Sequence, residues 1–201
     1  MRPTGSTAAP KPQGESWYSM RAAAGVAELR IEDEIGAWGI TAKQFAKDLK
    51  ALGDVSLIKL YVQSPGGDVF DGLAIYNILK HHPARVEGTV GSLAASMGSV
   101  ILMACDEISI PENAAIMVHK PWGIQGGDAD DMRKYADLLD QVEGSLVQAY
   151  MAKTGKTAEE IHALLNAETW MFGSEAVAAG FADKVLDPLT AFGQINSNRI
   201  Q

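Results

Sequence analysis

The chain has 201 residues, 47% of them hydrophobic, which is enough for one globular domain with a substantial core. Its formal net charge of -8, without any basic block, excludes a general nucleic-acid or anionic-membrane binder. The single cysteine, Cys105, excludes an internal disulfide framework and is typical of a reducing compartment. Because Cys105 lies in an apolar run, we expect it to be a small buried side chain.

Residues 1–24 are predicted to form a flexible N-terminal arm. Residues 1–14 are rich in Pro, Gly, Ser and Thr and lack the apolar segment of a secretory signal. Beyond the arm, segments with strand-like and helix-like apolar periods alternate, which predicts an α/β fold with a largely parallel sheet and right-handed crossovers. The predicted strands are 27–31, 55–62, 85–90, 107–110 and 115–119, and the predicted helices are 41–52, 69–79 and a run that follows Ser96.

One long helix is predicted over residues 128–153, because apolar residues recur there at three- and four-residue spacings until Gly155. A helix of this length can project from a compact domain and pack its apolar stripe against a neighbouring subunit. A capping box of Thr157 and Glu160 begins the next helix, and a short helix over 174–179 is closed by Gly180. Residues 196–201 form a polar tail.

Ser96 lies in a pentad of mostly small residues, 94–98, between a predicted strand that breaks at residues 91–92 and a helix-compatible run. Backbone N–H groups at a helix start have no intrahelical partner and favour negative charge. Such a place suits a serine nucleophile, whose attack on a carbonyl creates an oxyanion. The alternative is that Ser96 is only a helix N-cap.

A serine nucleophile needs a base, and His119 is the candidate among the four histidines. It closes an apolar run and precedes Lys120 and Pro121, so it is expected at a strand end, where the sites of open α/β sheets gather. A purely structural histidine is the alternative. His81 and His82 are expected at a solvated helix end, and His162 at the surface.

A loop with the sequence SPGGD, residues 64–68, follows the strand predicted at 55–62. Its glycines let backbone N–H groups approach a ligand closely, because no Cβ intervenes. We expect the N–H of Gly67 to join that of Met97 in an oxyanion hole. An ordinary strand-to-helix turn is the alternative.

Taken in order, residues 61–67 (YVQSPGG), 94–98 (AASMG) and 117–121 (MVHKP) resemble the Clp protease proteolytic subunit. The helix from Asp128 is similar to the handle helix of that family, and residues 168–185 also match. The resemblance covers residues 25–187 and implies a crotonase/Clp-protease-like fold of repeated ββα units, with a mostly parallel sheet and a protruding handle at about 128–153. It leaves residues 1–24 as the arm and residues 188–201 as a C-terminal tail.

The resemblance implies a Ser-His-Asp peptidase that works without a metal or cofactor. Ser96 would be the nucleophile, His119 the general base, and the backbone N–H groups of Gly67 and Met97 the oxyanion donors. The family's aspartate falls on Glu168 in this chain, and a glutamate can orient and charge-stabilise an imidazolium as an aspartate does. The alternatives are a surface role for Glu168 and Asp183 as the acid.

The implied function is a serine endopeptidase, ATP-independent in itself, that forms rings stacked through the handle in the cytoplasm of a bacterium or a phage-infected host. The Glu-Thr-Trp variant at 168–170 resembles head maturation proteases of tailed phages and prophages, which would trim capsid or scaffold proteins. We expect no nucleic-acid or membrane partner.

Four alternatives stay open. The first is general protein degradation with an unfoldase partner, although the N-terminal arm shows no clear match to the family's docking loops. The second is a Ser-Lys hydrolase of the signal-peptide-peptidase type, with Lys120 or Lys153 as the base. The third is a crotonase-type acyl-CoA enzyme, and the fourth is an inactive ring-forming capsid-assembly factor.

Overall fold

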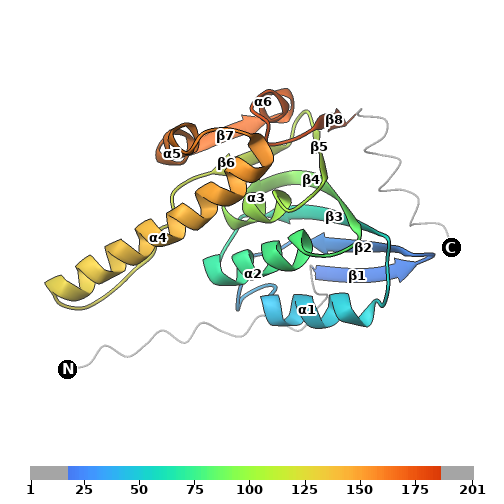
Figure 1. Cartoon of the computed structure of the whole chain (residues 1–201), viewed down its shortest axis with the longest axis horizontal. Coiled ribbons are helices and arrows are strands. Elements are labelled where there is room, and N and C mark those ends of the chain that lie inside the picture. The colour runs from blue at the N-terminus through green and yellow to red at the C-terminus, as the bar shows by residue number, and fades with distance from the viewer. Residues whose placement is uncertain (1–17, 187–201) are drawn as a thin grey trace.

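A computed structural model describes residues 18–186 and confirms the predicted α/β architecture. Helices lie along one face of a mixed sheet, and one long helix extends away from the body (Figure 1). The strands are β1 (Tyr18–Ala23), β2 (Val26–Ile31), β3 (Leu57–Ser64), β4 (Arg85–Ala95), β5 (Glu107–Pro111), β6 (Ala115–Val118), β7 (Thr169–Phe172) and β8 (Lys184–Leu186). The helices are α1 (Ala42–Ala51), α2 (Val69–Lys80), α3 (Met97–Leu102), α4 (Ala129–Thr154), α5 (Ala158–Asn166) and α6 (Gly173–Ala178).

The sheet runs in the order β1-β2-β3-β4-β5-β8, with β6 paired to β4 and β7 paired to β6. The β1–β2 and β6–β7 pairs are antiparallel and the other pairs are parallel, as the alternation of strands and helices predicts. The prediction of a flexible arm is wrong for residues 18–23, because all six pair with β2 as strand β1. Residues 1–17 of the predicted arm and the predicted tail at 188–201 lie outside the described residues.

Strand β4 runs without interruption from Arg85 to Ala95, so the strand break predicted at residues 91–92 is wrong. The first half of β4 pairs with β5 and its last three residues pair with β6, so the strand continues while its neighbour changes. Glycine at position 91 instead leaves room for the side chain of Tyr61, because a Cβ there would collide with the Tyr61 hydroxyl. The uninterrupted strand carries the chain to the edge of the sheet where Ser96 begins a turn.

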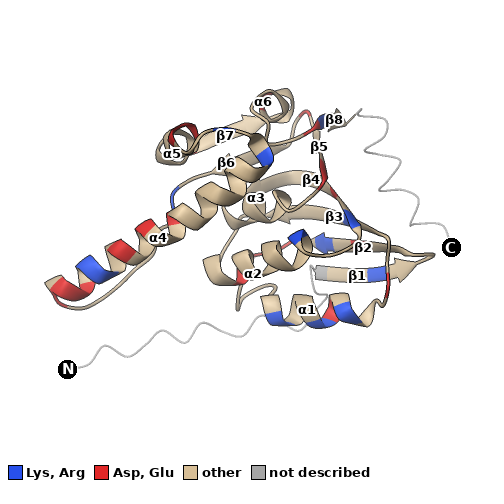
Figure 2. Cartoon of the chain, viewed as in Figure 1, with Lys and Arg blue, Asp and Glu red and all other residues tan. Residues whose placement is uncertain are grey.

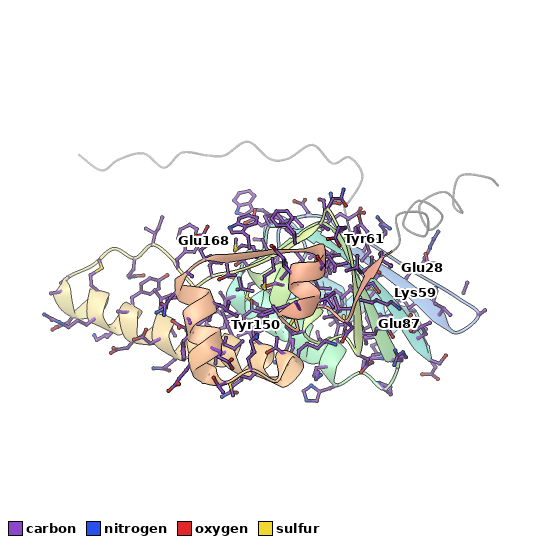
Figure 3. All side chains as sticks on the ribbon, turned by 90° about the horizontal axis from the view of Figure 1, so that it is seen from above. Glu28, Lys59, Tyr61, Glu87, Tyr150 and Glu168 are labelled. Atoms are coloured by element: carbon purple, nitrogen blue, oxygen red, sulfur yellow. The ribbon has the colours of Figure 1, made fainter. Side chains whose placement is uncertain are left out.

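The two faces of the sheet differ in chemistry. Residues of β2 and β3 alternate between full burial beneath the helices and partial or full exposure on the outer face. On that outer face, strand register aligns Arg21, Glu28, Lys59, Glu87 and Glu107 in one row across five strands, and Figure 3 labels three of these residues. The apolar core therefore lies on the helix side of the sheet.

Helix α4 is the predicted long helix. Asp128 is its N-cap in a capping box with Asp131, and Gly155, at φ 70°, ends it in the left-handed region. Its buried residues begin at Val142, whereas its first half projects and carries many charged side chains (Figure 2). Across residues 18–186, none of the helices combines the length and apolarity needed to span a bilayer.

Candidate active site

Ser96 and His119 meet at one edge of the sheet. Strands β4 and β6 are parallel with Ala95 opposite Met117, so the residues that follow each strand emerge side by side. The backbone N–H of Ser96 donates to the carbonyl of Met117 over 2.9 Å. The Oγ atom of Ser96 lies 2.8 Å from Nε2 of His119, which is a hydrogen-bond distance. The fold thus brings the two predicted residues into direct contact.

The backbone of Ser96 is strained. Its φ of 52° and ψ of -124° place a non-glycine residue in a region that costs about 1–3 kcal/mol. Its side chain makes no capping hydrogen bond to α3, so the interpretation of Ser96 as only an N-cap is wrong. A sharp strand-to-helix turn of this kind presents a hydroxyl at the edge of the sheet, free to face a base.

Two buried hydroxyls hold this turn from behind, and sequence reasoning missed both. Ser99 donates its hydroxyl to the carbonyl of Ser96 over 2.6 Å, and its Oγ lies 2.8 Å from the hydroxyl of Tyr150. Because the Ser99 proton is already committed, the Tyr150 hydroxyl is the donor in the second bond. Burial raises the pKa of Tyr150, which keeps it protonated and able to donate. A serine three residues after Ser96, within an apolar helix, is the sequence signal.

The Gly66–Gly67 loop lies directly against the serine turn. A Cβ on Gly66 would lie 2.6 Å from Cβ of Ser96 and 3.0 Å from the nitrogen of Met97, and Gly66 has a φ of 100°. The carbonyl of Gly66 accepts from the N–H of Ile35, and the N–H of Asp68 donates to the carbonyl of Ile35. The N–H of Gly67, which lies between them, therefore points away from Ile35. Neither the Gly67 nor the Met97 N–H donates a hydrogen bond to any described residue.

Ser64 supports this loop from within the protein. Its buried hydroxyl donates to the carbonyl of Asp33 over 2.7 Å and accepts from the N–H of Gly66 over 3.1 Å. Sequence reasoning gave Ser64 no role beyond the loop. The available signal is a serine at a strand position whose alternation predicts an inward-facing apolar residue.

Glu168 is near the pair but not in contact with it. Antiparallel pairing sets Val118 opposite Thr169, so one further step along the same register would set His119 opposite Glu168. Figure 3 shows Glu168 where α5 leads into β7. Glu168 is exposed, has a φ of 49°, and makes no hydrogen bond to His119 among the described residues. The structure therefore brings the predicted acid to the correct strand end without joining it to the imidazole.

The lysines of the Ser-Lys alternative and the fallback acid have other partners. Lys120 lies 3.3 Å from the carboxylate of Glu143. Lys153 donates to Asp183 over 2.8 Å and to two backbone carbonyls at residues 105 and 106. Asp183 also accepts from the N–H of Ile108. Within residues 18–186, His119 is the side chain hydrogen-bonded to the Ser96 hydroxyl, which disfavours a lysine base.

The three other histidines and Cys105, for which no catalytic role was predicted, lie outside the contact between Ser96 and His119. His81 bonds through Nδ1 to the carbonyl of Asn77 at the end of α2, and His82 accepts from the N–H of Ala84. His162 is half-exposed and donates to Glu143 over 2.7 Å. Cys105 is buried, as predicted, and burial raises the pKa of its thiol to about 12. A thiol in this state is unreactive at neutral pH.

Comparison with known proteins places this site in a family. Residues 17–188 match the family described as Clp protease. The chain is 39% identical over 133 residues to the ATP-dependent Clp protease proteolytic subunit 2 of Thermobifida fusca (strain YX), a match that covers 64% of each protein. It is 36% identical over 131 residues to the ATP-dependent Clp protease proteolytic subunit 1 of Leifsonia xyli subsp. xyli (strain CTCB07), covering 64% of this chain and 66% of the relative. The matched region thus spans just under two thirds of each relative. The chain belongs to the Clp protease family.

Proposed function

We propose that this chain is a serine endopeptidase that cleaves peptide bonds through an acyl-enzyme on Ser96. The observation that carries the proposal is the 2.8 Å contact between the Ser96 hydroxyl and Nε2 of His119 at a strained turn. A hydroxyl in reach of an imidazole is the arrangement that activates a weak nucleophile near neutral pH.

In the proposed reaction, Oγ of Ser96 attacks the carbonyl carbon while Nε2 of His119 takes the hydroxyl proton. The carbonyl π electrons move to its oxygen, and the tetrahedral intermediate then expels the amine, which leaves with the proton from His119. A water molecule, deprotonated by His119, attacks the acyl carbon and releases the acid and free Ser96. Atoms and protons balance over the two halves, so no cofactor is needed.

The N–H groups of Gly67 and Met97 are the proposed oxyanion donors. Gly66 packs against Ser96 and Met97, and both N–H groups are without an acceptor in the described part of the chain. A Cβ on Gly67, which has a φ of 144°, would collide with the carbonyl of Ile35, so glycine is required at this position. Each such donor contributes about 3–4 kcal/mol to transition-state stabilisation.

Glu168 is the proposed acid, the third member of a catalytic triad with Ser96 and His119. Continuing the Val118–Thr169 register by one step places Glu168 opposite His119, which supports the assignment, and catalytic hydrogen bonds often tighten only when substrate binds. We further propose that subunits assemble into rings through α4 and act in the cytoplasm. The Glu-Thr-Trp sequence at 168–170 supports a role in phage capsid or scaffold processing. The names of the two relatives favour the second candidate, a proteolytic subunit that serves an ATP-dependent protease.

A fluorophosphonate probe tests the peptidase proposal, because it reacts only with an activated serine. We expect covalent labelling of the wild-type chain and its loss in both Ser96→Ala and His119→Ala. The matched controls are Ser145→Ala and His81→Ala, which remove the same groups from exposed positions. Absence of labelling in the wild type at every pH from about 6 to 9 would contradict the proposal. Labelling that survives His119→Ala but not Lys120→Met would favour the Ser-Lys alternative.

Co-expression with capsid and scaffold proteins tests the biological role. Specific cuts in those proteins, lost in Ser96→Ala, are the expected result for head maturation. Degradation that occurs only when an ATP-dependent unfoldase is added would instead identify the second candidate.

A further inference from the structure

We infer that Glu143, on the buried half of α4, is a positioning residue for the proposed catalytic pair and acid. The inference rests on the proposed peptidase function, since it concerns how that site is held. Glu143 touches neither Ser96 nor His119 and acts through Lys120 and His162.

The carboxylate of Glu143 is buried and paired on both oxygens. Its side chain is 8% exposed, Oε1 accepts from Nδ1 of His162 over 2.7 Å, and Oε2 lies 3.3 Å from Nζ of Lys120. The neighbouring residues Val142 and Leu146 are buried and apolar. A buried carboxylate costs several kcal/mol of desolvation, and a well-packed apolar side chain often does better when only stability is at stake. The buried charge is therefore better explained by a role in fixing the positions of its two partners.

One partner of Glu143 is the residue next to the proposed base. A residue that precedes proline favours an extended conformation, in which successive side chains point in opposite directions. His119 points toward Ser96 and Lys120 toward α4. Anchoring Lys120 on Glu143 thus fixes the rotation of the backbone that aims the imidazole.

The other partner leads to the proposed acid. His162 lies on α5, and α5 ends two residues before Glu168. The hydroxyl of Thr169 donates to the carbonyl of Leu164 over 2.8 Å, which ties the start of β7 to the same helix. Figure 1 shows α5 beside the second half of α4. The carboxylate of Glu143 on α4 therefore contacts both the segment that carries the proposed base, His119, and the helix that leads to the proposed acid, Glu168.

Labelling kinetics of Glu143→Gln test the inference. The change keeps the size of the side chain and removes its charge. We expect the fluorophosphonate inactivation rate at saturating probe to fall about 10- to 100-fold, because small misplacements of a catalytic group have effects of this size. The apparent affinity for the probe should not change, and every subunit should still label at long times. Glu143→Asp, which keeps the charge, should recover part of the rate.

Asp140→Asn is the matched control, because it removes the same charge from an exposed position one turn earlier on α4. Its labelling rate should equal that of the wild type. Lys120→Met tests the contact from the other side. If Glu143 acts through Lys120, the Glu143→Gln, Lys120→Met double variant should label about as slowly as the slower single variant.

The outcomes separate the two proposals. A wild-type chain that does not label overturns the proposed function itself. A labelled wild type with Glu143→Gln at the wild-type rate overturns the role of Glu143. A wild-type rate with fewer labelled subunits also overturns it, because that result identifies a stabilising role only. If Glu143→Gln does not fold, wild-type labelling by both Glu143→Asp and Lys120→Met overturns the inference.

Discussion

At Ser96, three features act on one residue. The strained φ of 52° aims the hydroxyl along the sheet edge, the Ser99 hydroxyl holds the carbonyl, and His119 meets Oγ at 2.8 Å. Strain of this kind persists only where the surrounding structure over-determines it. Glu168 is also at positive φ, at 49°, beside this site. Its longer arm gives the chain one more rotatable bond than an aspartate would have.

Glu168→Gln is the sharpest test of the proposed acid. The amide keeps the shape of the side chain but cannot stabilise an imidazolium or select the required tautomer. We expect kcat for a peptide substrate to fall about 10³- to 10⁴-fold, by analogy with acid-to-amide changes in catalytic triads, while the melting temperature stays constant. Glu159→Gln, exposed on the preceding helix, is the control. An unchanged kcat in Glu168→Gln would remove Glu168 from the triad.

At the scale of elements, the two halves of α4 differ in their surroundings and in their roles. Its first half is exposed and charged, whereas its second half buries Val142, Leu146 and Tyr150 against the body. Through Tyr150 this half reaches Ser99 under α3, and the Tyr150 ring packs on Phe181 at a centroid distance of 5.6 Å. The same half carries Glu143. The buried segment thus supports the site, and the projecting segment is available to partners.

Removing one hydroxyl measures the α4–α3 contact. Tyr150→Phe deletes the donor to Ser99 while keeping the ring, so we expect a loss of about 1 kcal/mol in the free energy of unfolding. Urea unfolding followed by circular dichroism gives the value. Tyr135→Phe, on the first half of α4, should change stability by much less. Equal effects of the two variants would show that the buried hydroxyl contributes nothing specific.

At the scale of the whole molecule, apolar side chains are exposed along α4 and the segment that leads to it. Trp122 is 72% exposed and Ile124 88%, with Met132 and Leu138 on α4 each at 41%. Exposed apolar groups on a projecting element support the proposed contact between subunits. The outer face of the sheet carries the row of charged residues that runs from Arg21 to Glu107 and is unlike such a contact.

The double variant Met132→Glu, Leu138→Glu tests assembly. Two charges on the projecting stripe should disrupt packing between copies, so we expect a smaller particle with unchanged circular dichroism. Light scattering coupled to gel filtration measures the mass. Lys134→Glu, Asp137→Lys, which alters exposed charges on the same half of α4, is the control. A wild-type mass of 21.4 kDa, the monomer, would contradict the proposed rings.

Local patterns were sufficient for much of the fold. Apolar period and capping residues identify α1, α2, α4 and α5, and the alternation of elements identifies a largely parallel sheet. Patterns failed where a partner distant in sequence decides the structure. The pairing with β2 makes a strand of residues 18–23, and the change of neighbour from β5 to β6 keeps β4 continuous through Gly91.

By itself the sequence determined the family, the α/β class, and Ser96 and His119 as the residues to test, because short motifs and apolar periods are local properties of the chain. Only the tertiary structure decided the 2.8 Å contact between them, the hydroxyls of Ser64 and Ser99 behind the site, and the pairing of Glu143 with Lys120 and His162. These contacts join residues from different elements, or depend on which face of an element is buried. Their distances follow from sheet register and helix packing, which no local pattern encodes.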